Sequence, residues 1–93
     1  MTPDRVREVA AKYRDLLIKE GVTPSRISEV ESTAPHYVVA KEKMGHLLWV
    51  CVTLKEVVEK GKIEQARRWL CFVQGALWGM ELISIQDLRE DDV

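Results

Sequence analysis

Two histidines and two cysteines are the side chains of this sequence best suited to metal, acid-base or redox chemistry. The positions one helical turn after His46 hold Trp49 and Val50, and the other histidine, His36, is about three turns away, so that no second histidine or carboxylate follows His46 at the spacing of a metal site. We therefore predict no metal site and no cofactor. We expect His46 to be half-buried in a helical bundle and hydrogen-bonded there, with Gln74 as its partner.

Cys51 and Cys71 are level with each other if the two helices that carry them run antiparallel. They would then form either a redox pair or two buried and chemically inert side chains. Neither cysteine has the neighbouring base that nucleophilic catalysis needs, so the sequence predicts no catalytic residue.

Glu56 and Glu59 lie one helical turn apart, as do the paired carboxylates that hold magnesium in all-helical nucleotide hydrolases. Such enzymes need a second acidic pair on the following helix, and Glu81 has Ser84 at the required spacing instead of a carboxylate. A magnesium-dependent nucleotide hydrolase that uses Glu56 and Glu59 is therefore an alternative function, and a protein that is not an enzyme is favoured over it.

Basic side chains gather where a helical hairpin would close, and such a cluster could contact the phosphates of a nucleic acid. Acidic side chains, Glu56, Glu59 and Glu64, are interleaved with them, which is typical of a solvated helix face with ion pairs. Nucleic-acid binding is thus a second alternative, and a nucleic-acid partner is not favoured. The basic residues of the cluster are Lys55, Lys60, Lys62, Arg67 and Arg68.

Aromatic residues and glycines are interspersed along the second half of the chain. Aromatic side chains are common hot spots of protein interfaces, and glycine inside a helix costs about 1 kcal/mol relative to alanine. Gly75 and Gly79 therefore indicate a tight helix crossing, within one chain or between two, with Gly45 at the same level. The predicted interface residues are Trp49, Trp69, Phe72, Trp78, Gly75 and Gly79.

The elements that carry these residues are helical, because apolar residues recur at helical spacing and no segment alternates as a strand would. Thr2 and Ser84 are suited to begin helices, with Asp87 completing a capping box at Ser84, and Gly21 and Gly61 are suited to end them. We predict one all-α domain, residues 1–93, built on a long antiparallel hairpin. Its parts are helix 3–20, connector 21–34, helix 35–60, helix 62–81 and a short helix 85–90.

Each helix of the hairpin carries one apolar stripe suited to packing inside the hairpin and a second stripe beside it. The second stripe includes Val50 and Val57 on the first helix, and Phe72 and Gly79 on the next. So much apolar surface exceeds what a small domain readily hides. We therefore expect a homodimer or a higher homo-oligomer, and a different protein is a further class of partner.

The charge of the chain and its targeting signals bear on the class of protein and on its location in the cell. The formal net charge of −1 excludes a chain that is basic throughout, and the segment 89–93, which is rich in acidic residues, is expected to fray. No apolar stretch approaches the ~20 residues that a membrane span needs, and the N-terminus lacks a secretory signal. We expect a cytoplasmic interaction module that does not associate with membranes.

Three segments of the sequence resemble small uncharacterised helical proteins encoded by phages and prophages: His46 to Trp49, Gly61 to Trp78, and Ile83 to Leu88. The resemblance covers roughly the C-terminal half of the chain. It implies an origin in a mobile genetic element. Because that group has no assigned activity, it implies no functional residue.

Overall fold

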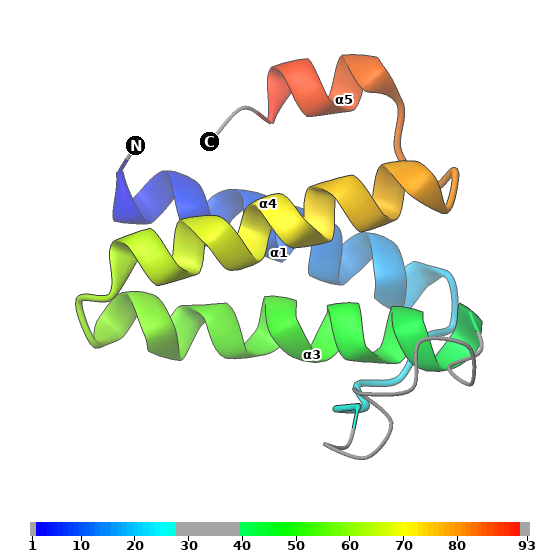
Figure 1. Cartoon of the computed structure of the whole chain (residues 1–93), viewed down its shortest axis with the longest axis horizontal. Helices are drawn as coiled ribbons and strands as arrows, with labels where there is room; N and C mark the ends of the chain where they lie inside the picture. Colours follow the sequence, from blue (N-terminus) through cyan, green and yellow to red (C-terminus); the bar gives the residue numbers. More distant parts are fainter. Residues whose placement is uncertain (1, 28–39, 92–93) are drawn as a thin grey trace.

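The computed structural model describes residues 2–27 and 40–91, and within them the chain forms four α-helices (Figure 1). These are α1 (Pro3–Lys19), α3 (Ala40–Glu59), α4 (Ile63–Gly79) and α5 (Ile85–Glu90). No strand occurs in the described ranges, and the predicted all-α fold is confirmed. The first residues of the predicted helix 35–60, and the second half of the predicted connector, lie outside the described residues.

The helices α3 and α4 form an antiparallel hairpin, and α1 packs against both of them (Figure 1). The turn between α3 and α4 is short because Gly61 adopts a left-handed conformation, with φ at 77°. The short helix α5 lies beside α1 and α4, on the side away from α3 (Figure 1). This arrangement brings the last turn of α5 close to the first turns of α1, where Arg5 binds the Glu90 carbonyl.

Local sequence explains where α1 begins and which of its faces is buried. The Thr2 hydroxyl accepts a hydrogen bond from the backbone N–H of Arg5 at 3.2 Å, and Pro3 occupies the first helical position. The apolar residues of one face then enter the core, where none is more than 4% exposed. They are Val6, Val9, Ala10, Tyr13 and Leu17.

The described valines of the second apolar stripe of α3 are buried within this one chain. Val50 and Val57, which belong to the second stripe, are 5% and 7% exposed. The expectation that this stripe awaits a partner is therefore wrong for α3, because α3 is covered by α1 as well as by α4. Single exposed apolar side chains remain on α1, α3 and α5, namely Ile18, Val52 and Ile85, whereas α4 carries two of them, Phe72 and Trp78.

The helices α1, α3 and α4 end in the same way, with a residue at positive φ. After α1 and α3 that residue is Gly21 or Gly61, and after α4 it is Glu81, at φ 64°. In each case the next backbone N–H donates back into the last turn, for example from Leu82 to the Leu77 carbonyl at 2.9 Å. Glu81 thus occupies a position that favours glycine.

Replacing Glu81 with glycine should raise the free energy of unfolding by about 0.5–1 kcal/mol, because the left-handed conformation is strained for any residue with a Cβ. Glu20, at the end of α1, is the matched control, since its φ of −78° carries no such strain. Glu20→Gly should lower stability through the added freedom of the unfolded chain. Urea unfolding measures both variants, and changes of the same sign would contradict this account of Glu81.

Candidate functional site

The exposed side of α4 carries apolar and small residues that the described part of the chain leaves uncovered. Phe72 is 55% exposed and Trp78 is 49% exposed. A side chain placed at Gly75 or Gly79 would meet no atom of the described residues within 4 Å. We call Phe72, Gly75, Trp78 and Gly79 the outer face of α4.

Charge is missing from this part of the sequence. Residues 69–80 contain no Asp, Glu, Lys or Arg, although several of them are exposed on α4. A solvated helix face ordinarily carries charged side chains. The outer face of α4 therefore has the composition of the centre of an interface, from which charged residues are depleted.

Within the described residues, Gly75 and Gly79 do not lie at a crossing with another helix, so the prediction of a crossing inside the hairpin is wrong. The glycine with a close neighbour is Gly45, where a Cβ would lie 3.0 Å from the carbonyl oxygen of Thr23. The backbone N–H of Ser25 also donates to the Gly45 carbonyl at 3.0 Å. Gly45 thus admits the segment that follows α1, and the two glycines of α4 face outward.

Trp49 and Trp69 lie apart from Trp78 and are half-buried between α3 and α4. Their ring centroids are 6.3 Å apart at an interplanar angle of 36°, and His46 stacks on Trp49 at 5.6 Å. With Phe72 these rings line a pocket of about 380 Å³, whose rim includes Arg26. We call it the aromatic pocket. Its full lining is Arg26, Ile27, His46, Trp49, Val50, Trp69 and Phe72.

His46 is half-buried, as expected, but its hydrogen-bond partner differs from the prediction. The Nδ1 atom of His46 accepts from the backbone N–H of Ile27 at 3.2 Å, whereas Gln74 lies elsewhere and binds Tyr13. Burial, followed by the positive charge of Arg26, lowers the pKa of His46. The imidazole is therefore neutral at pH 7 and carries its proton on Nε2.

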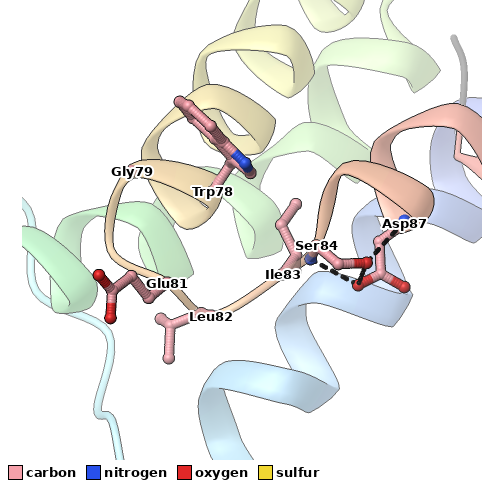
Figure 2. Close-up of a pocket in the computed structure, with 7 residues that line it drawn as sticks. All are labelled: Trp78, Gly79, Glu81, Leu82, Ile83, Ser84 and Asp87. Atoms are coloured by element: carbon pink, nitrogen blue, oxygen red, sulfur yellow. Dashed lines mark hydrogen bonds between the residues drawn. The ribbon is translucent and has the colours of Figure 1, made fainter.

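A second pocket, of about 520 Å³, lies between the end of α4 and the start of α5 (Figure 2). Its polar groups bind one another, since Asp87 Oδ2 accepts from Ser84 N at 2.8 Å while Ser84 Oγ accepts from Asp87 N at 3.1 Å. The predicted capping box is confirmed. The pKa of Asp87 is lowered because its Oδ2 atom accepts from the backbone N–H of Ser84 and also from Ser84 Oγ, at 2.9 Å. Because the cap already engages Ser84 and Asp87, the remaining polar side chain of this lining is Glu81, beside the apolar side chains of Trp78, Leu82 and Ile83 (Figure 2).

The two cysteines have different surroundings. Cys51 is 5% exposed and lies in a region lined by Arg14 and other residues of α1, whereas Cys71 is exposed on α4. The expectation of two buried thiols is therefore wrong for Cys71. A redox pair across the hairpin is not favoured either, because one thiol faces the core and the other faces solvent.

Thiol labelling should distinguish the two cysteines. Burial raises the pKa of the Cys51 thiol to about 12, so that the reactive thiolate is scarce there as well as hidden. In dilute solution a disulfide reagent such as Ellman's should modify one thiol rapidly, and Cys71→Ser should abolish that rapid phase. Cys51→Ser should preserve it, and the reverse result would contradict the orientation of both helices.

The charged candidates lie near the closed end of the hairpin. Lys55, Lys60, Lys62 and Arg68 are exposed, and Arg67 is half-buried with a 3.5 Å ion pair to Glu64. Glu56 and Glu59 are exposed on α3. Among the described residues, no group of three or more histidine, cysteine, aspartate or glutamate side chains is placed to hold a metal ion.

A buried polar cluster joins the end of the chain to α1 and α4. Asp91 is 4% exposed. Its carboxylate accepts hydrogen bonds from Lys12 Nζ at 2.8 Å and from the Tyr13 hydroxyl at 3.0 Å. Gln74 Nε2 donates to the Tyr13 hydroxyl at 3.1 Å and to the Asp91 carbonyl at 2.8 Å. We call Lys12, Tyr13, Gln74 and Asp91 the Asp91 cluster.

Sequence reasoning missed this cluster and expected residues 89–93 to fray, of which 92 and 93 lie outside the described residues. Asp91 is instead bound, and burial raises the pKa of Tyr13, so that its hydroxyl stays protonated and donates to the carboxylate. The one available signal was Tyr13 itself, because a buried tyrosine needs a partner for its hydroxyl. Nothing in the spacing of the residues indicated that this partner would be Asp91.

Comparison with known proteins identifies no relative: no protein-family model, no curated protein and no solved structure matches the chain. Within the described residues, none of the helices has both the length and the apolar character needed to cross a membrane.

Proposed function

We propose that this chain is a non-enzymatic helical interaction module that forms a homodimer through the outer face of α4. The observation that carries the proposal is the pairing of exposed Phe72 and Trp78 with glycines that have open space beside them. Aromatic anchors that fill neighbouring hollows are the usual centre of a stable interface. The absence of charge from residues 69–80 removes the cost of burying ions there.

A second copy is the occupant that this face fits best, because the face is complementary to itself. A two-fold axis places the same residues on both sides of an interface. If two copies of α4 pack antiparallel, Phe72 of one copy can enter the space beside Gly75 and Gly79 of the other. Small residues at such a contact allow the two helices to approach closely.

Phe72→Glu should prevent self-association. The wild-type protein should sediment as a dimer at micromolar concentration, and the variant as a monomer, because a carboxylate cannot be buried there without a partner. Loss of a central aromatic anchor alone costs about 2 kcal/mol of association free energy, or about thirtyfold in the dissociation constant. Analytical ultracentrifugation over a concentration series gives both values.

Val52→Glu provides the matched control. Val52 is 48% exposed, close to the value for Phe72, but it lies on α3 beside Lys55 and residues of α1. This variant should dimerise as the wild type does, and circular dichroism should show that both variants are folded. A wild-type protein that stays monomeric at high concentration, or a dimer lost equally in both variants, would overturn the proposal.

The two alternative functions suggested by the sequence predict different experimental results. Binding of nucleic acid by the cluster from Lys55 to Arg68 would appear as affinity for a DNA or RNA duplex that falls steeply with salt. Hydrolysis of nucleotides by Glu56 and Glu59 would appear as magnesium-dependent release of phosphate from nucleoside triphosphates. The exposed acidic residues near the basic cluster, and the lack of a third ligand beside the two glutamates among the described residues, favour the interaction module.

The biological setting of the proposal follows from sequence features. The resemblance of the C-terminal half to phage and prophage proteins supports an accessory role in a mobile element. Cys51 and Cys71 are free thiols in the structure, which suits a reducing compartment such as the cytoplasm. Expression of tagged protein and its fractionation would test this location.

A further inference from the structure

Beyond self-association, we infer that the aromatic pocket binds a planar aromatic anion. The pocket lies between the α3 and α4 helices, and three indole or imidazole rings and one phenyl ring line it. Small-molecule sites are typically concave and mostly aromatic or aliphatic, with a few polar groups that fix the orientation of the ligand. The aromatic pocket has this composition and the Asp91 cluster does not.

The rings favour a flat ligand. Trp49 and Trp69 are tilted by 36° at a centroid separation of 6.3 Å, and His46 lies almost parallel to Trp49, at 20°. Ring faces arranged in this way attract another ring through stacked or edge-to-face contacts. The volume of about 380 Å³ lies near the lower end of the range for ligand pockets, which suits one or two fused rings.

The charge at the rim favours an anion. The guanidinium carbon of Arg26 lies 5.1 Å from the centroid of the Trp49 ring, where it contacts the ring face and also lines the pocket. The hydrogen bond from Ile27 to Nδ1 of His46 leaves the proton on Nε2, so that His46 offers a second N–H donor. Among the residues that the structure describes, none that lines the pocket is acidic.

The pocket therefore combines stacking surfaces with the positive charge of Arg26 and the neutral N–H donor of His46. A cation of the same shape would be repelled by Arg26, and a saturated ring system would lose the contacts with the ring faces. Phe72 belongs to both this pocket and the outer face of α4, but Trp49, Trp69 and Arg26 belong to the pocket alone. Ligand binding by the pocket can therefore be tested independently of the proposed dimer.

The test is a titration with 2-naphthoate, followed by the indole N–H resonances of the three tryptophans in ¹H–¹⁵N NMR spectra. Trp49 and Trp69 should shift in a saturable manner, and Trp78, which lies in the other pocket, should stay unchanged as an internal control. The cationic analogue 2-(aminomethyl)naphthalene and the saturated decahydro-2-naphthoate should each bind about tenfold more weakly or worse, a factor expected for one charged contact or one stacking contact.

Two exposed arginines give a matched pair of variants. Arg26→Gln should weaken 2-naphthoate about tenfold and remove its advantage over the cationic analogue. Arg14→Gln, on α1 beside Asp15, should leave both affinities unchanged. Equal binding of the anion and the cation, a shift of Trp78 as large as those of Trp49 and Trp69, or no saturable shift at all would overturn the inference.

Discussion

Leu70→Ala should lower the free energy of unfolding by about 3 kcal/mol, whereas Phe72→Ala, two positions along the same helix, should change it by less than about 1 kcal/mol. Leu70 is 0% exposed in the core between the three long helices, so its truncation leaves a cavity that a packed interior fills only in part. Phe72 is 55% exposed, and its removal leaves no enclosed space.

Urea unfolding in dilute solution measures this pair of variants without a contribution from self-association. The comparison tests the rotation of α4 about its own axis, on which the proposed dimer depends. A rotated helix would bury Phe72 and expose Leu70, and it would reverse the order of the two effects. In that case the outer face of α4 would have to be redefined, and Phe72→Glu would disrupt folding rather than association.

Asp91→Ala should lower the free energy of unfolding by about 2–3 kcal/mol, a large effect for a residue so close to the end of a chain. The substitution removes the acceptor of the Tyr13 hydroxyl, which is buried, and a buried donor left without a partner costs about 1–3 kcal/mol. Lys12 loses its ion pair as well, but this contributes less, because the Lys12 side chain is 49% exposed and regains water.

Glu90→Ala is the control for Asp91→Ala. The Glu90 side chain is exposed and binds Gln86 on the same helix, so its loss should change stability by less than about 0.5 kcal/mol. Tyr13→Phe removes the donor of the same hydrogen bond. The double variant Tyr13→Phe with Asp91→Ala should lose less free energy of unfolding than the sum of the two single losses. Equal effects of Asp91→Ala and Glu90→Ala would contradict a structural role for the Asp91 cluster.

The Asp91 cluster also explains how a helix with no buried residue is held in place. The helix α5 contributes no residue to the core, yet its first turn is fixed by the capping box at Ser84 and its last turn by Asp91. Arg5 adds a hydrogen bond from its guanidinium to the Glu90 carbonyl at 2.7 Å. Hydrogen exchange in α5 should therefore accelerate in Asp91→Ala more than in Glu90→Ala.

The sequence by itself determined the helices and most of their ends. The cap at Thr2, the capping box of Ser84 and Asp87, and the glycines after α1 and α3 are all decided by residues within five positions of one another. Such local interactions are visible in a sequence because the geometry of a helix fixes which residues meet. The exception among these helix ends is the end of α4. Glu81 adopts positive φ there although it is not a glycine, so its residue type does not predict that the helix ends.

The tertiary structure decided which apolar stripe is covered and which polar groups are paired. It buries Val50 and Val57 and leaves Phe72 exposed, a choice that depends on how α1 lies across the hairpin. It also pairs the His46 side chain with the backbone N–H of Ile27, and the Tyr13 hydroxyl with the Asp91 carboxylate, 78 positions away in the sequence. The pattern of one helix specifies a face but not its neighbour, because the neighbour is set by the packing of all the helices together.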